Sequence, residues 1–250
     1  MSPKTLSLAI VSVLLSPVLF AAEDDIETID VTGRKQNLIG ESVSASEGVV
    51  SQADIDIRPL MRTGEILELV PGMVVTQHSG NGKANQYFLR GINLDHGTDF
   101  STVVDGMPLN MRTHAHGQGY TDLNFIIPET IERLSYKKGA YYAEVGDFSG
   151  AGSAHMHTAK TFEQGLAEFG LGDHGFFRTV VVDSQTRGNQ SLSYAAEYAL
   201  FDGPWENTSE DLDRKNLWVK YLKQNSSGII LCCHNIHKTQ SHISLTIFSV

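Results

Sequence analysis

A two-residue alternation near the middle of the chain restricts its fold more than any other feature. Within residues 190–201, apolar side chains occupy every second position, and small or polar side chains lie between them; the apolar set is Leu192, Tyr194, Ala196, Tyr198 and Leu200. Residues two apart share one face of a β-strand, so this segment predicts a strand with one apolar face. Rougher versions at 177–181 and 217–221 predict neighbouring strands. Soluble sandwiches and transmembrane barrels both contain such strands, and the alternation leaves both open.

Composition excludes several classes of protein without selecting one. The chain has 250 residues, 41% of them hydrophobic, and can therefore bury a core. Its formal charge of −10 argues against a nucleic-acid partner, because nucleic-acid binders carry basic patches. The cysteines, Cys232 and Cys233, are adjacent, which leaves no zinc ribbon, redox motif or disulfide framework.

Residues 1–22 have the pattern of a secretory signal peptide. Lys4 precedes an apolar run, and Ala21 and Ala22 end it with the small residues typical of a cleavage site. The run is short for a membrane span and is interrupted at Ser16 and Pro17. We therefore expect export of the chain and cleavage of this segment.

Residues 23–45 are polar and acidic, and they predict a flexible arm. The arm contains one β-prone island, residues 26–32, in which Ile29 and Val31 share a face. A mobile segment of this kind can add itself as a strand to the open sheet edge of a partner. The alternative is an unstructured leader whose periodicity is accidental.

Residues 46–161 predict a compact α+β domain built from short elements. Ser51 and Thr63 are placed to cap two short helices, the second over residues 64–69. The other expected elements are strands at 73–76, 87–90, 101–104 and 134–137 and a helical turn at 127–133. Glycine-rich and proline-rich turns separate them.

Residues 162–224 have room for about four strands of the length found in transmembrane barrels. Such a set alone cannot form a pore, because lipid does not satisfy the backbone groups of two open sheet edges. From residue 225 the alternation stops and both cysteines appear. We expect 225–250 to be an aberrant tail from a frameshifted or truncated reading frame. The alternative is a genuine, divergent pair of strands.

Two pairs of histidines are the most distinctive local feature of the chain. His114 and His116, and likewise His155 and His157, are two residues apart and would share a face of an extended segment. Together the four imidazoles could bind zinc, copper, nickel or iron. No firm acidic ligand is spaced nearby, and a structural, hydrogen-bonding role is the alternative for these loops.

Several motifs follow one another in an order that is typical of one family. They are residues 66–75 (ILELVPGMVV), 89–92 (LRGI), 103–109 (VVDGMPL), 127–134 (IPETIERL) and 138–140 (KGA). With the export signal before them, they resemble the plug domain of TonB-dependent outer-membrane receptors. Residues 27–33 (ETIDVTG) resemble the TonB box of that family. Residues 145–157 depart from the family's usual end of the plug, which indicates a divergent subgroup.

The resemblance implies an α+β plug domain, a small mixed sheet with short helices, followed by the first antiparallel strands of a transmembrane β-barrel. The barrel of such receptors has 22 strands. The plug blocks the pore, and a small-molecule ligand binds from outside. The box, here Glu27, Thr28, Ile29, Asp30, Val31 and Thr32, then pairs with TonB, which an inner-membrane complex energises.

The resemblance also implies roles for single residues. Arg90 and Arg133 match arginines that latch the plug to carboxylates of the barrel. The loops at 78–87, 94–101 and 111–120 match those that face the ligand. The expected ligand contacts are Tyr87, His96, Arg112, His114, His116 and Tyr120.

We therefore expect an outer-membrane receptor for uptake of a scarce nutrient, such as a metal chelate or a siderophore. No cofactor is firmly implied, although a metal ion or chelate is a candidate cargo. A secreted or periplasmic metal-binding protein or metalloenzyme using the histidine pairs is the alternative, and a plain extracellular binding module is a third. The sequence has no nucleophile–base set, P-loop or dinucleotide motif, so we do not expect an enzyme.

Overall fold

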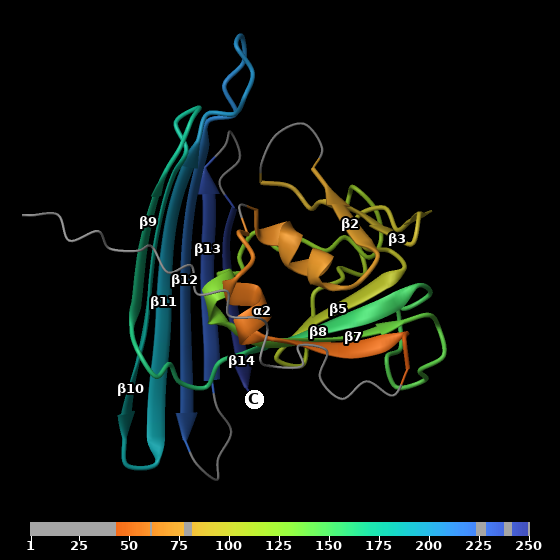
Figure 1. Ribbon diagram of the computed structural model, residues 1–250, viewed down its shortest axis with the longest axis horizontal. Helices are drawn as coiled ribbons and strands as arrows, with labels where there is room; N and C mark the ends of the chain where they lie inside the picture. The colour runs from red at the N-terminus through yellow and green to blue at the C-terminus, as the bar shows by residue number, and fades with distance from the viewer. Residues whose placement is uncertain (1–43, 61, 78–81, 224–228, 238–241, 250) are drawn as a thin grey trace, which may run out of the picture. The chain divides into compact units, whose positions relative to one another are not determined.

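The computed structural model describes residues 44–60, 62–77, 82–223, 229–237 and 242–249 (Figure 1). The expected signal peptide and the expected TonB box lie outside these ranges. None of the helices within the described ranges is both long enough and apolar enough to cross a membrane.

Residues 47–158 form a mixed sheet, a small antiparallel sheet and short helices, as the sequence predicts. The larger sheet has the order β1-β7-β8-β5-β6, in which β5 and β8 run parallel, and the smaller one has the order β2-β3-β4. The bounds are β1 Glu47–Ser51, α2 Gln52–Asp56, η1 Thr63–Leu69, β2 Met73–Thr76, β3 Gln86–Leu89, β4 Ile92–Asn93, β5 Phe100–Val104, β6 Met107–Pro108, η2 Pro128–Thr130, β7 Ile131–Lys138 and β8 Gly152–Thr158.

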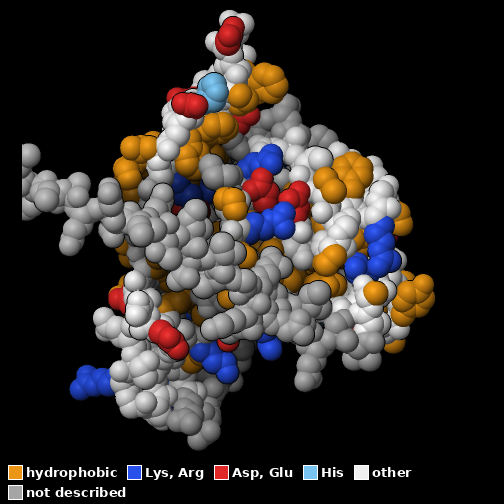
Figure 2. All heavy atoms as spheres, in the orientation of Figure 1, with side chains coloured by type: hydrophobic (Ala, Val, Ile, Leu, Met, Phe, Trp, Pro, Cys, Tyr) orange, Lys and Arg blue, Asp and Glu red, His pale blue; other side chains and the backbone are white. Residues whose placement is uncertain are grey.

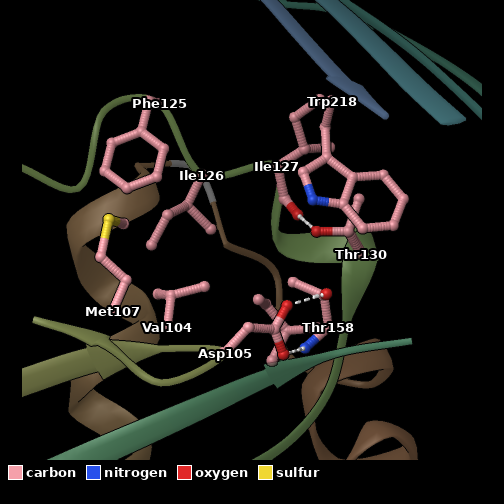
Figure 3. A pocket seen from close by; sticks show the side chains of 10 residues that line it. Val104, Asp105, Met107, Phe125, Ile126, Ile127, Thr130, Thr158 and Trp218 are labelled. Carbon is pink, nitrogen blue, oxygen red and sulfur yellow. Dashed lines mark hydrogen bonds between the residues drawn. The ribbon is translucent and has the colours of Figure 1, made fainter. Parts of the chain in front are cut away.

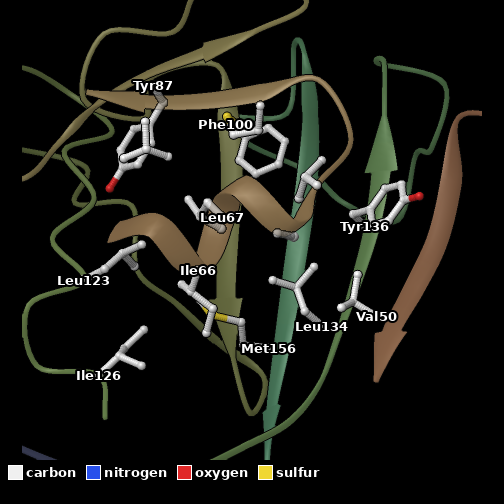
Figure 4. Close-up of a cluster of buried hydrophobic side chains, with 14 of the residues drawn as sticks. Val50, Ile66, Leu67, Tyr87, Phe100, Leu123, Ile126, Leu134, Tyr136 and Met156 are labelled. Atoms are coloured by element: carbon white, nitrogen blue, oxygen red, sulfur yellow. The ribbon is translucent and has the colours of Figure 1, made fainter. Parts of the chain in front are cut away.

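The core of this domain lies between the helix η1 and the larger sheet. Ile66 and Leu67 of η1 are fully buried, and they belong to one cluster with Leu134 of β7 and Met156 of β8 (Figure 4). Burying an aliphatic side chain of this size contributes about 1.5–3 kcal/mol. The cluster therefore holds the sheet and η1 together, and it positions the loops that leave them.

Both expected caps differ from the structure. Ser51 precedes α2, but its side chain makes no cap hydrogen bond. The helix η1 is a 3₁₀ helix whose cap is Arg62 instead of Thr63, which is its first residue. The backbone N–H of Arg62 donates to the Glu65 carboxylate at 3.1 Å. Glu65 thus supplies the half of a capping box in which a side chain of the first turn accepts the N–H of the cap residue.

The expected helical turn at 127–133 is shorter in the structure. Helical geometry covers Pro128–Thr130 alone, and β7 begins at Ile131. The residues from Ile131 onward pair with β8, and those from Arg133 onward also pair with β1. Ladder hydrogen bonds to two strands outweigh the weak local preference for a turn.

The second part of the described chain is an antiparallel meander, in which every strand pairs with its neighbours in sequence (Figure 1). Its first strands, β9 to β12, fall within residues 162–224. The bounds are β9 Leu166–Leu171, β10 Phe177–Arg187, β11 Gln190–Phe201, β12 Leu212–Lys223, β13 Ile229–His237 and β14 His242–Ser249. The strands β10 to β12 are 11 or 12 residues long.

The two faces of β11 are the reverse of those in a soluble sandwich. Its small and polar residues are buried, with Ser193 at 0% and Glu197 at 4% exposure, whereas the apolar Leu192 is 41% exposed. On the neighbouring strands, Val181 and Leu217 are likewise exposed. Hydrophobic side chains are also exposed on the side where β9 lies (Figure 2). An apolar outer face and a polar inner face are the pattern of a transmembrane barrel.

The backbone of the expected aberrant tail forms strands. β13 pairs with β12, and β14 pairs with β13, both antiparallel. This agrees with the alternative of a divergent strand pair as far as the backbone is concerned. A frameshifted origin of residues 225–250 stays a prediction.

Candidate functional site

The inner face of the strands β10 to β12 contacts the α+β domain of residues 47–158, which is named the plug below, through buried and half-buried ions. Arg178 of β10 binds Glu129 of η2 in a bidentate pair, with N···O distances of 2.6 and 2.9 Å. Arg178 also donates from Nε to Glu197 of β11 at 2.7 Å. One guanidinium therefore joins a plug carboxylate to a strand carboxylate, and its fork geometry orients both.

Glu197 is the centre of this network. Its carboxylate is fully buried and accepts from Arg178 and Arg214 at Oε1 and from Asn216 at Oε2. The amide of Asn216 also donates to the backbone carbonyl of Asn124 in the plug, at 2.9 Å. Because two cations and an amide surround the carboxylate, its charge is compensated despite the burial.

A second polar contact lies beside a small pocket of the plug (Figure 3). Lys220 of β12 donates from Nζ to the carbonyl and the hydroxyl of Thr158, at 3.0 and 2.9 Å, and lies 3.4 Å from Asp105. The Asp105 carboxylate accepts from the hydroxyl and the backbone N–H of Thr158, as the dashed lines in Figure 3 show. Lys220 thus holds the turn after β5 to the end of β8.

An apolar cluster accompanies the two polar contacts. Ile127 of the plug packs with Val180, Val182 and Ala195 of the strands and with Trp218 of β12. All five are at most 5% exposed. The contact between plug and strands therefore combines a desolvated apolar centre with paired charges, as specific protein interfaces do.

The expected latch residues do not take part in this contact. Arg90 follows β3 and Arg133 lies in β7; both are exposed, and neither pairs with a carboxylate among the described residues. The observed ion pairs have the opposite polarity, with cations on the strands and carboxylates on the plug. The roles of Arg90 and Arg133 stay a prediction.

The expected ligand residues divide into buried and exposed groups. Tyr87 is 1% exposed and donates its hydroxyl hydrogen bond to the carbonyl of Thr121, so it supports the fold from within. Tyr120 is also buried, and burial raises the pKa of its phenol. Arg112 is exposed and pairs with Asp147 at 3.0 Å. The side chain of Tyr87 therefore lies in the core, and His96 is also buried, at 6% exposure.

The loops at 94–101 and 111–120 bring three histidines together. His96 and His116 meet through their Nε2 atoms at 2.8 Å. His114 stacks on Tyr120 with ring centroids 3.9 Å apart, and its Nδ1 accepts the backbone N–H of His116. His114 and His116 therefore do not share a face of an extended segment, because residues 114–119 lie in turns.

His155 and His157 lie on β8, where residues two apart do share a face. Burial lowers the pKa of both imidazoles, with Lys137 and Arg133 lowering it further at His155 and His157, respectively. Among the residues that the structure describes, no group of three or more His, Cys, Asp or Glu side chains is arranged to hold a metal ion. No described contact joins this pair to His114 and His116.

Sequence reasoning missed the charged residues of the plug–strand contact. Four of these residues occupy alternate, inward positions of β11 and β12, namely Glu197, Arg214, Asn216 and Lys220. The sequence did contain a signal for them, because each is a polar residue in the row of small or polar side chains that alternates with the apolar row. A charged residue in a row that faces a pore interior is a candidate for a contact with whatever fills the pore.

Comparison with known proteins gives a consistent match. Residues 40–153 match the model of the TonB-dependent receptor plug domain. The vitamin B12 transporter BtuB of Vibrio vulnificus (strain YJ016) is 29% identical over 175 residues, which are 69% of this chain and 27% of that protein. The chain therefore spans about a quarter of the length of this relative.

Solved structures match the fold over most of the chain. The copper transporter OprC aligns with a TM-score of 0.60 and 19% identity, covering 78% of this chain and 30% of its own. The siderophore receptor PirA from Acinetobacter baumannii aligns with a TM-score of 0.53 and 17% identity, covering 78% of this chain and 32% of its own. At these identities the likeness concerns the fold.

Proposed function

We propose that the chain is a TonB-dependent receptor, with its plug domain at residues 40–153, and that it imports a scarce small nutrient across the outer membrane. The observation that carries the proposal is the inner face of β10 to β12. Glu197 and Lys220 are buried there against the plug and Arg178 is half-buried, while the opposite face is apolar. Strands of this kind are suited to lipid outside and to a plug inside.

The nutrient belongs to the range that the relatives indicate. Their names specify vitamin B12, copper and siderophores. These ligands are metal ions or metal complexes, and the family consists of transporters and receptors instead of enzymes. We propose that the loops at 94–101 and 111–120 meet the ligand through Arg112 and His116, which are exposed, and through His96, which is buried beside His116.

The arm would transmit the energy for transport to the plug. The outer membrane has no nucleotide supply and no ion gradient of its own, so the force must come from the inner membrane. We propose that residues 27–32 add as a strand to TonB, and that tension on the arm moves the plug. Export of the chain, followed by cleavage of residues 1–22, would place the arm in the periplasm.

Energy dependence tests this function directly. Cells that express the receptor are given, in turn, radiolabelled cobalamin, an iron–siderophore complex and copper. We expect one of them to accumulate, and we expect a proton uncoupler to stop accumulation while binding at the cell surface persists. The proposal is contradicted if none accumulates, or if accumulation continues unchanged in the presence of the uncoupler.

Membrane placement is tested by a charge on the outer face. Val181 lies near the middle of β10, is 47% exposed and pairs with Ala167 and Ala196. Val181→Arg should lower the amount of folded receptor in the outer membrane, because arginine near the bilayer midplane costs about 2–4 kcal/mol. The measurement is heat-modifiable migration of the outer-membrane fraction.

Gln185→Arg is the matched control for this substitution. Gln185 lies further along the same face of β10, close to the turn at 188–189, where an arginine reaches the interface and costs about 0–1 kcal/mol. A Val181→Arg variant that folds and fractionates as well as Gln185→Arg would rule out a lipid-facing β10. A soluble binding module or metalloenzyme predicts that result.

A further inference from the structure

We propose that Nε2 of His96 and Nε2 of His116 form a binding site for an imidazole-preferring divalent cation, such as Zn²⁺, Cu²⁺ or Ni²⁺. As the first contact for a transported ion, the site rests on the proposed function. It differs from the pairing of His114 with His116 and of His155 with His157 that the sequence suggests. Its two ligands come from different loops.

The position of one hydrogen of His96 follows from two of its partners. Its Nδ1 lies 3.2 Å from the carbonyl oxygen of Ala84 and 3.0 Å from that of Asn85. Carbonyl oxygens only accept, so Nδ1 carries the hydrogen and the neutral ring has its lone pair on Nε2. A backbone carbonyl that orients the far nitrogen of an imidazole is the usual outer support of a metal-ligating histidine.

The lone pair of His96 points at a second imidazole. At 2.8 Å the two Nε2 atoms share one hydrogen, which His116 donates. When the hydrogen of His116 moves from Nε2 to Nδ1, the ring stays neutral and a cation can use the lone pairs of both Nε2 atoms. Two nitrogens on one Zn²⁺, each at about 2.0–2.1 Å, would lie roughly 3.3 Å apart, so a small movement of His116 is enough. His116 is exposed and can make that movement.

The surrounding groups favour a positive ion. The Asp95 carboxylate lies 3.7 Å from Nε2 of His96 and is 56% exposed, so it can approach as a further ligand or through a water. His114 is held apart, because its Nδ1 accepts the backbone N–H of His116 and its ring stacks on Tyr120. His114 therefore positions His116, and water or cargo would fill the open coordination positions.

The two loops are held in place by hydrogen bonds. The N–H of Thr121 donates to the carbonyl of His96 at 2.9 Å, and Met111 bridges to Tyr120. The buried amide of Asn110 donates to the carbonyls of Gly97, Phe100 and Gly119. The loop backbones that carry the two imidazoles are thus fixed, which reduces the entropy cost of binding.

The test is metal binding by the purified protein in detergent. Titration calorimetry with Zn²⁺ and with Mg²⁺ should show tighter binding of Zn²⁺, and His116→Gln should weaken Zn²⁺ at least tenfold. His155→Gln, in the other histidine pair, is the matched control and should bind as the unaltered protein does. Electron paramagnetic resonance of bound Cu²⁺ should show two imidazole nitrogens, and one in His116→Gln.

The possible outcomes separate the proposals. Equal binding of Zn²⁺ and Mg²⁺, unchanged affinity in His116→Gln, or affinity that falls in His155→Gln instead would overturn the site. Binding of zinc citrate but not of the free ion would also overturn it, in favour of a chelate. The measurement needs no energised membrane, so a failure of uptake with metal binding intact would count against the proposed function alone.

Discussion

Replacing Glu197 by alanine is expected to destabilise the receptor by about 3–5 kcal/mol, the usual cost of removing one partner from a buried ion pair. The substitution leaves Arg178 and Arg214 inside the protein without the carboxylate that both contact. It also removes the acceptor of Asn216, which donates to the plug. We expect the contact between plug and strands to loosen first.

Urea unfolding of the purified receptor in detergent measures this effect. Trp218 lies in the apolar part of the same contact, so its fluorescence should report when plug and strands separate. Glu168→Ala is the matched control, since Glu168 is an exposed carboxylate on β9. Equal midpoints for Glu197→Ala and Glu168→Ala would show that the buried network does not hold the plug.

A second substitution distinguishes lost pairing from a general packing defect. Removing Arg214 in the Glu197→Ala background, as Arg214→Met, takes away one uncompensated charge. We expect the double variant to regain part of the stability, because a buried pair can be replaced by apolar residues at little cost. Additive losses would indicate that the two residues act independently.

Replacing Ile29 by proline is expected to abolish energised uptake. Proline has no N–H to donate to an added strand, and its fixed φ disfavours pairing within a sheet. Accumulation of whichever ligand the cells take up should fall to the level seen with a proton uncoupler. Binding at the cell surface should not change, because the expected ligand contacts lie in loops outside the arm.

Gln36→Pro is the control for this variant. It places proline in the same arm, outside the β-prone island at 26–32. We expect it to take up ligand at the normal rate. Normal accumulation by Ile29→Pro would mean that the island is not the segment that TonB grips, and equal loss in both variants would indicate a need for arm flexibility alone.

Part of the fold could be predicted because its signals are local. The alternation that exposes Leu192 and buries Ser193 is visible in the sequence, and the helix before Pro71 and the strands after it follow from turn residues. Boundaries such as the start of β7 at Ile131 were less predictable, because pairing with β1 and β8 decides them.

The candidate sites depended more strongly on tertiary structure. The histidine pairs are obvious in the sequence, yet His116 meets His96, 20 residues earlier, instead of sharing a face with His114. Tyr87 matched a loop expected to face the ligand, but its side chain turns into the core. A turn directs a side chain by its backbone conformation, which residue spacing alone does not specify.

By itself, the sequence determined a plug-like α+β domain and strands with one apolar face, and it predicts an export signal. Only the tertiary structure decided that this face points outward, and that Arg178 meets Glu129, 49 residues away. The physical reason is the sequence distance over which each kind of interaction acts. Periodicity and turn chemistry act between neighbours, whereas burial and ion pairing depend on which distant segments the folded chain brings into contact.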